Sequence, residues 1–374
     1  MKKILQTLFS IKNNSNKSHK ILTILGIKIK FKLKSKHSQF MKEIEYRNFM
    51  IRVLQEEKDC LLKNYSNFMP IKTPNSKVYL LNDTRRTENH IGCSLVYKNI
   101  LKLCKNNKMQ VYFSDSSFPN SEENIGDYKS IIKYCDILLF NGEGTLHDSV
   151  GINMFEKCKY AKQLGKKVYL INTVWQNNQN VEHYLDYFDL IACRESFSFK
   201  NIPDKYKAKS IIVPDLTFYN KLNCKKDNQR KLIFTDSVIP EITDELKKIA
   251  DKYHSDFYYL NFNENEDAKY LSEETLAKLQ KDSLIITGRF HALTMGLKYQ
   301  IPTLAYPSNT YKIQGLLCDA GLSEYCMTNF DISKSQIDKF INYNHNAFIE
   351  KSILYSENAK KQIEKLFNLI GNIN

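Results

Sequence analysis

The segment that decides the fold is Leu284-Ile285-Ile286-Thr287-Gly288-Arg289-Phe290-His291-Ala292. Its first four residues form an apolar run typical of a buried strand, and Gly288 ends that run just before a stretch of helical character. In an open α/β sheet, ligands bind at the carboxyl ends of the strands, where the next helix presents free N–H groups. Arg289 adds a planar group that suits a carboxylate or phosphate, and His291 adds a group that exchanges a proton near neutral pH. The segment therefore predicts an enzyme that handles an anionic small molecule.

Short apolar runs of strand length alternate with helical stretches on both sides of this segment. The expected strands are 78–81, 110–113, 137–140, 168–171, 190–192 and 211–213 before residue 220, and 231–235, 257–261, 284–287 and 303–306 after residue 230. Helical windows such as 94–104 and 154–164 separate them. This alternation is typical of parallel sheets with helices on both faces. The sequence therefore predicts an α/β protein with two Rossmann-like domains that face each other across a cleft.

The chain is long enough for these two domains and two appendages. It has 374 residues, of which 42% are hydrophobic and 12% aromatic, and this supports sizeable cores. We expect a basic leader with a helical appendage at 1–75, an N-terminal Rossmann-like domain at 76–219, a polar linker at 220–230, a C-terminal Rossmann-like domain at 231–332 and a helical tail at 333–374. The tail could fold back and brace the two domains.

The formal net charge of +14 comes largely from the first 42 residues, which contain eleven lysines and no acidic residue. The rest of the chain is nearly neutral, and no nucleic-acid-binding motif accompanies the leader, so no nucleic-acid partner is expected. Ile27, Ile29 and Phe31 alternate with lysines, a period-two pattern typical of a strand. Two interpretations of the leader stay open: an apolar edge backed by lysines on an anionic inner membrane surface, or a basic tail that keeps the chain soluble. Residues 38–67 have helical spacing and would pack on the body or pair with another chain.

Cysteine usage and hydropathy indicate where the protein works. Nine dispersed cysteines without a CxxC pair are typical of reduced thiols in a cytoplasm. No run of eighteen apolar residues is present, so no transmembrane helix is expected. We therefore predict a cytoplasmic protein, peripheral to the inner face of the membrane if the leader binds lipid. The histidines show no HxH or HExxH spacing, so no metal site is expected.

Two polar clusters follow strands of the expected first domain. Asp83 ends the first strand, and His90 stands just before the next helix. The turn Asn141-Gly142-Glu143-Gly144-Thr145-Leu146-His147 follows the third strand, and its glycines permit a backbone close to a ligand. This turn lacks the Gly-Lys-Ser/Thr of a P-loop, so it does not indicate a nucleoside triphosphate site.

Two arginines mark the ends of later strands. Arg194 could close on an anion, or it could form a structural bridge with Glu195 or Asp215. Arg289 stands two residues before His291, and no structural partner for it is evident from the sequence. If Arg289 binds a ligand, Arg289→Ala should reduce activity far more than stability.

Together these motifs carry a family resemblance. The His-x-Gly-Cys helix start, the Asn-Gly-Glu-Gly-Thr-Leu-His turn, Ala-x-Arg-Glu-Ser-x-Ser, Gly-Arg-Phe-His-Ala and the later Tyr311-Lys312 occur in the order that resembles the polysaccharide pyruvyl transferase family, over roughly residues 76–325. The resemblance implies a two-domain fold of the GT-B kind. It also implies transfer of pyruvate from phosphoenolpyruvate to a pair of sugar hydroxyls as a cyclic ketal. By the same resemblance, Arg194, Arg289 and His291 match residues thought to hold and activate phosphoenolpyruvate.

The expected site combines these residues without a cofactor, with phosphoenolpyruvate as donor substrate and a glycan as acceptor. His291 is the candidate general acid for the donor's methylene carbon, and either Glu143 or Asp83 is the candidate base for the acceptor hydroxyl. The expected substrate-binding residues are Asp83, His90, Asn141, Gly142, Gly144, Thr145 and Lys312. The main alternative is a GT-B glycosyltransferase that uses a nucleotide-activated sugar, which the leader favours because it resembles leaders of surface-glycan glycosyltransferases. A third reading is a scaffold that binds glycan or membrane without catalysis.

Overall fold

The computed structural model describes residues 9–13, 19–24, 27–32, 74–84, 91–115, 128–261, 268–327 and 333–372. The chain divides into two compact units, residues 1–69 and residues 70–374. The helix predicted at 38–67 lies outside the described residues.

The first unit contains a three-stranded antiparallel sheet, formed by β1 (Phe9–Asn13), β2 (His19–Ile24) and β3 (Ile27–Lys32) in the order β1-β2-β3. The strand predicted from the isoleucine–lysine alternation is confirmed as β3, whereas β1 and β2 were not expected. The register pairs Leu22 with Ile29, and Ile24 with both Ile27 and Phe9.

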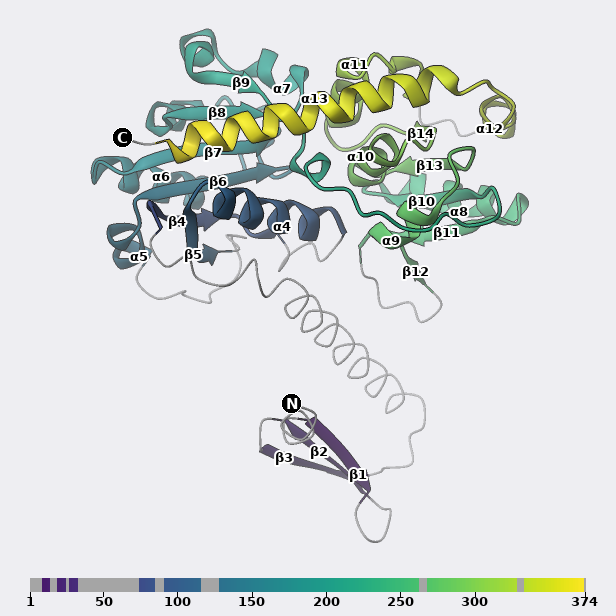
Figure 1. The fold of residues 1–374 in the computed structure, drawn as a ribbon, viewed down its shortest axis with the longest axis horizontal. Coiled ribbons are helices and arrows are strands. Elements are labelled where there is room, and N and C mark those ends of the chain that lie inside the picture. Colours follow the sequence, from purple (N-terminus) through teal and green to yellow (C-terminus); the bar gives the residue numbers. More distant parts are fainter. Residues whose placement is uncertain are drawn as a thin grey trace. The chain divides into compact units, whose positions relative to one another are not determined.

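The second unit begins with a six-stranded parallel sheet (Figure 1). Its strands, in the order β5-β4-β6-β7-β8-β9, are β4 (Ser76–Leu81), β5 (Met109–Asp115), β6 (Ile137–Glu143), β7 (Lys167–Thr173), β8 (Leu190–Cys193) and β9 (Ser210–Ile212). The apolar runs are continuous because both faces of this sheet are covered. Val78 and Leu80 belong to one core cluster, and Tyr79 and Leu81 belong to another.

Helices and 3-10 turns connect these strands. They are α4 (Ile91–Asn106), α5 (Tyr128–Tyr134), α6 (Ile152–Gln163), η2 (Glu182–Tyr187), α7 (Ser196–Asn201), η3 (Asp204–Lys209) and η4 (Leu216–Phe218). From residue 219 to residue 231 the chain has no helix or strand.

A second parallel sheet follows, in the order β12-β11-β10-β13-β14. Its strands are β10 (Leu232–Ser237), β11 (Asp256–Tyr259), β12 (Lys269–Tyr270), β13 (Leu284–Gly288) and β14 (Thr303–Ala305). The accompanying helices are α8 (Pro240–Lys252), α9 (Glu273–Lys278), α10 (Phe290–Tyr299), α11 (Lys312–Asp319), η5 (Ser323–Tyr325) and α12 (Lys334–Ile341). The strands predicted from the sequence are confirmed, with ends that shift by a few residues and with β12 added. The expected fold class, an α/β protein with two Rossmann-like halves, is therefore confirmed.

The last helix, α13 (Asn346–Gly371), runs alongside both halves (Figure 1). It contacts α10 in the second half and α4 in the first. Its buried face includes Phe348, Ile363 and Phe367, which belong to the same core cluster as Val78 of β4 and Phe234 of β10. One continuous core therefore joins the two halves beneath the long helix.

Both sheets have a point at which the strand order reverses. In the first sheet the chain leaves β4 for β5 on one side and returns to β6 on the other, and in the second sheet β10 is flanked in the same way by β11 and β13. Such switch points are where open α/β sheets bind ligands, at the carboxyl ends of the strands. The strands that flank the two points end at Leu81, Glu143, Ser237 and Gly288.

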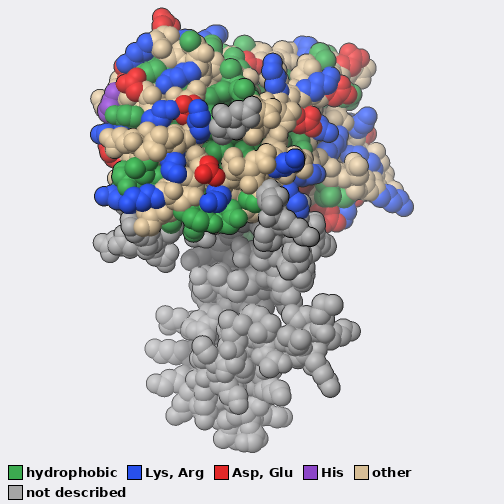
Figure 2. Space-filling view, turned by 60° about the vertical axis from the view of Figure 1, so that its left-hand side comes forward, with side chains coloured by type: hydrophobic (Ala, Val, Ile, Leu, Met, Phe, Trp, Pro, Cys, Tyr) green, Lys and Arg blue, Asp and Glu red, His purple; other side chains and the backbone are tan. Residues whose placement is uncertain are grey.

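Figure 2 shows one face of the molecule, on which basic and acidic side chains are interspersed over the described part. This agrees with the nearly neutral charge of the chain after its leader.

Candidate active site

Glu143 ends β6 at the first switch point and is buried, with 3% of its surface exposed. Its backbone has a φ of 40°, a left-handed conformation that an ordinary residue seldom adopts. The Thr84 hydroxyl donates to Oε2, and the Cys93 thiol donates to the same oxygen at 3.6 Å. Oε1 makes no hydrogen bond to any residue that the structure describes. Burial is the main cause that raises the pKa of Glu143 to about 7, so this carboxyl exchanges its proton near neutral pH.

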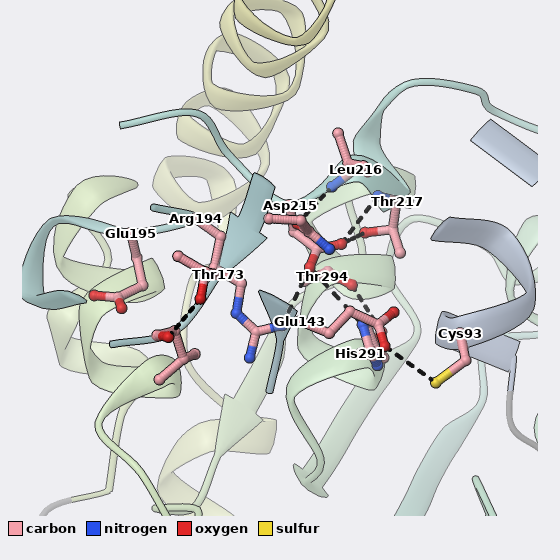
Figure 3. Close-up of polar contacts among 12 residues, drawn as sticks. Cys93, Glu143, Thr173, Arg194, Glu195, Asp215, Leu216, Thr217, His291 and Thr294 are labelled. Atoms are coloured by element: carbon pink, nitrogen blue, oxygen red, sulfur yellow. Dashed lines mark hydrogen bonds and ion pairs between the residues drawn. The ribbon is translucent and has the colours of Figure 1, made fainter. Parts of the chain in front are cut away.

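Arg194 follows β8 and is 1% exposed (Figure 3). Its Nη1 lies 3.4 Å from Asp215 Oδ2, and its Cζ lies 3.9 Å from the centre of the Phe290 ring. Its Nε has no hydrogen-bond partner among the described residues. A buried guanidinium has five N–H donors to satisfy, and one acceptor at 3.4 Å leaves most of that capacity for a ligand.

Gly144 brings the turn after β6 close to Arg194 and to Lys312 of α11. A Cβ atom at Gly144 would lie 3.4 Å from Arg194 Nη2 and 3.6 Å from Lys312 Nζ. Lys312 is itself buried, and it donates to Asn309 Oδ1 at 2.7 Å. Two buried cations, one from each half, therefore lie close to Gly144, which has no side chain. We call Gly144, Arg194 and Lys312 the anion cradle, because a phosphate or carboxylate group lying over Gly144 would be close to both cations.

His291, the second residue of α10, lies against the first half. A Cβ at Gly92 would come within 2.1 Å of His291 Cγ, so only glycine allows the imidazole to pack on the start of α4. His291 Nε2 is 3.8 Å from Asp215 Oδ2. Burial, followed by the positive charges of Arg194, Lys312 and Arg289, lowers the pKa of His291 well below its usual value. The lowered pKa of His291 disfavours its protonated form, whereas the raised pKa of Glu143 favours a protonated carboxyl. The assignment of acid and base roles to these residues stays a prediction.

Arg289 has a structural partner that the sequence interpretation missed. Its Nε donates to Asp236 Oδ2 at 2.9 Å, and its Nη2 contacts the same oxygen. Asp236 lies in β10 at the second switch point, 3% exposed, and it also accepts the Leu260 backbone N–H. The pair gives Arg289 a structural role at the switch point of the second sheet, and its role in ligand binding stays a prediction. An aspartate at the end of a predicted strand was the signal available in the sequence.

The remaining residues of the glycine-rich turn shape the backbone. Asn82 donates to the Asn141 carbonyl at 2.7 Å and to Thr145 Oγ1 at 3.1 Å, which ties the end of β4 to the turn. A Cβ at Gly142 would lie 2.3 Å from Thr173 Oγ1, so Gly142 permits close packing against β7. Asn141, Gly142 and Thr145 thus position Glu143 and Gly144 within the turn.

Other predicted residues are not brought to the anion cradle by these contacts. Asp83 accepts a hydrogen bond from Ser114 at 3.1 Å, which directs it toward β5, while Thr84 is the residue that reaches Glu143. His90 lies outside the described residues. The two partners left open for Arg194 are now distinguished: Asp215 pairs with it, whereas Glu195 caps α7 by accepting the Phe197 and Ser198 backbone N–H groups.

Two surveys cover the part of the chain that the structure describes. Among these residues no group of three or more His, Cys, Asp or Glu side chains is arranged to hold a metal ion. No helix in the same residues has both the length and the apolar character needed to cross a membrane.

The chain is an α/β protein with two Rossmann-like halves and buried cations where the halves meet. The family model described as polysaccharide pyruvyl transferase matches residues 87–310, and the chain belongs to that family. A search of curated proteins finds no match.

Several solved structures are similar over most of the chain. They include an uncharacterized protein from Klebsiella pneumoniae (16% identity, covering 74% of this chain and 98% of that one, TM-score 0.42). MurG from Acinetobacter baumannii is 12% identical and covers 79% of this chain and 99% of its own, with a TM-score of 0.46. An O-GlcNAc transferase from Thermobaculum terrenum is 10% identical and covers 80% of this chain and 67% of its own, with a TM-score of 0.42.

Proposed function

We propose that this protein transfers the pyruvyl group of phosphoenolpyruvate to two hydroxyls of a sugar in a bacterial surface polysaccharide, forming a cyclic ketal. The proposal rests on the family to which the chain belongs and on one observation, the anion cradle. Arg194 and Lys312 are buried, come from opposite halves, and both lie beside Gly144, which has no side chain. Phosphoenolpyruvate carries a phosphate and a carboxylate on three carbons, so a compact pair of buried cations fits its charge.

The cradle suits this donor for a second reason. Arg194 presents a planar fork that can bind two oxygens of one carboxylate or phosphate, whereas Lys312 is a point charge that can follow the phosphate as it departs. Buried cations aimed at developing negative charge stabilise a leaving phosphate more strongly than cations in water, because the surroundings screen them less. Removing one such donor reduces the rate by roughly 10²–10³-fold in other enzymes.

Binding of the donor can be tested without knowing the acceptor. We expect phosphoenolpyruvate to raise the midpoint of thermal unfolding of the full chain, and UDP-, GDP- and CMP-sugars to leave it unchanged. At a ligand concentration about 100 times Kd, the stabilisation should be about 2.7 kcal/mol. The opposite pattern would favour a glycosyltransferase that uses a nucleotide-activated sugar. If neither phosphoenolpyruvate nor a nucleotide sugar stabilises the protein, the remaining interpretation is a scaffold that binds glycan or membrane without catalysis.

The membrane contact of the leader stays a prediction. β1, β2 and β3 form a small antiparallel sheet, and their strands contain both apolar residues and lysines. Each lysine near an anionic surface contributes about 1 kcal/mol to binding. We propose that this sheet holds a cytoplasmic enzyme at the inner membrane, near a lipid-linked acceptor. Binding to phosphatidylglycerol vesicles should weaken between 0.05 and 0.5 M NaCl, roughly as the screening length shortens. Binding that does not change with the salt concentration, or no binding at all, would contradict this proposal.

A further inference from the structure

The two oxygens of the Glu143 carboxyl have different surroundings. Oε2 accepts hydrogen bonds from Thr84, which follows β4, and from Cys93 in α4. Oε1 is buried and makes no hydrogen bond to a described residue. The next residue in the chain is Gly144, which forms the floor of the anion cradle. A hydroxyl and a thiol thus hold one oxygen of the carboxyl, and the other oxygen is buried without a hydrogen bond to a described residue.

We propose that Glu143 is the catalytic acid that protonates the methylene carbon of phosphoenolpyruvate, and that Thr84 and Cys93 are positioning residues that hold its other oxygen. This assignment rests on the proposed function and adds to it. Figure 3 shows Glu143 gathered with Arg194, Asp215 and His291, with Cys93 bonded to its carboxyl. The residue therefore lies among the groups that would surround the reacting carbon.

Every charged group around this site bears on the protonation of Glu143. Burial and the negative charge of Asp215 raise its pKa, and Arg194 and the two hydrogen-bond donors lower it, with a result of about 7. A bound phosphoenolpyruvate adds negative charge beside Glu143 and offsets Arg194 and Lys312, so it raises the pKa further. His291 has its own pKa lowered first by burial and then by Arg194, Lys312 and Arg289. A bound donor offsets the positive charges of Arg194, Lys312 and Arg289, but His291 stays buried, so its pKa remains lowered.

The reaction begins with the transfer of a proton from Glu143 to the donor. The C2=C3 electron pair of the donor takes the proton of Glu143, which forms a C3–H bond and leaves an oxocarbenium centre at C2. The first sugar oxygen bonds to C2 and gives its proton to neutral His291, which passes it to the departing phosphate. The second sugar oxygen then bonds to C2 as the C2–O bond to phosphate breaks with its electron pair, and its proton restores the Glu143 carboxyl. The products are the ketal and hydrogen phosphate, and no oxidant or reductant is needed.

Proton uptake on donor binding tests the assignment without an acceptor. Titration of the full chain with phosphoenolpyruvate at pH 8, in buffers of different ionisation enthalpy, should show uptake of about one proton per donor bound, because Glu143 is mostly ionised at pH 8 before binding. Glu143→Gln should bind the donor without uptake, and His291→Asn should retain the uptake. Binding without uptake in the wild type, or uptake that survives Glu143→Gln, would overturn the assignment. Absence of binding would instead overturn the proposed function and this assignment with it.

The pH at which uptake begins tests the positioning residues. Uptake starts where the free carboxyl ionises, near the pKa of Glu143. Thr84→Val and Cys93→Ala each remove a hydrogen bond that favours the ionised form, so both should move the onset to higher pH, Thr84→Val by more. The uptake measured at pH 7 should fall accordingly. If either variant weakens binding but leaves the onset where it is in the wild type, that residue has only a structural role.

Discussion

Gly144→Ala is expected to weaken phosphoenolpyruvate binding by about 10²-fold while the protein remains folded. The new methyl group would stand 3.4 Å from Arg194 Nη2 and 3.6 Å from Lys312 Nζ, which are ordinary contact distances. Gly144 does not have the left-handed φ that would strain alanine. The methyl group therefore fits the empty protein but occupies the place where the anion should lie. A charge-assisted hydrogen bond contributes about 1.5–3 kcal/mol, and 2.7 kcal/mol corresponds to about 10²-fold in Kd.

Calorimetric titration with phosphoenolpyruvate measures this effect, and thermal unfolding checks the fold. Gly142→Ala in the same turn is a matched control with the opposite expected pattern. There the Cβ would lie 2.3 Å from Thr173 Oγ1 and 2.9 Å from its Cα, so the change should reduce stability. If Gly144→Ala binds the donor as the wild type does, the anion does not sit between Arg194 and Lys312.

Arg289→Ala is expected to lower the free energy of unfolding by about 3–5 kcal/mol, the usual effect of leaving one partner of a buried ion pair uncompensated. The partner is Asp236, whose side chain is 4% exposed against 13% for Arg289. Urea unfolding monitored by circular dichroism measures the change. This expectation differs from the one drawn from the sequence, in which Arg289→Ala affected activity more than stability.

The double variant Arg289→Ala/Asp236→Ala separates the two readings. It removes both charges and should recover part of the lost stability, because no buried carboxylate is left without a partner. Unchanged stability in Arg289→Ala, together with loss of donor binding, would show that Arg289 serves the ligand and that its pair with Asp236 is incidental.

The fold was predictable because its signals are local. The apolar runs that became β4, β6, β7 and β13 are buried on both faces, so each is visible as a continuous stretch. The strands β1, β2 and β12 were missed for related reasons. β1 and β2 contain lysines and polar residues among their apolar ones, and β12 is two residues long. Strand order was not predictable either, since it depends on pairing between distant segments.

The site was predictable only as a set of candidates. Sequence position identified Arg194, Glu143 and His291, because each lies at or just beyond a predicted strand end. The contacts among these groups depend on how the two halves pack, and the spacing of residues along the chain does not predict that packing. Asp215 as the partner of Arg194, Thr84 rather than Asp83 beside Glu143, and the direction of each pKa all follow from burial in the folded protein.

The central claim is that phosphoenolpyruvate binds at the anion cradle. The ³¹P resonance of phosphoenolpyruvate, recorded with the wild-type chain and then with Gly144→Ala, tests this claim most directly, because a phosphate held in a 43.8 kDa protein relaxes faster than one free in solution. We predict broadening of the resonance by the wild type and a sharp line with Gly144→Ala. A sharp line with the wild type, or equal broadening by both proteins, would contradict the claim.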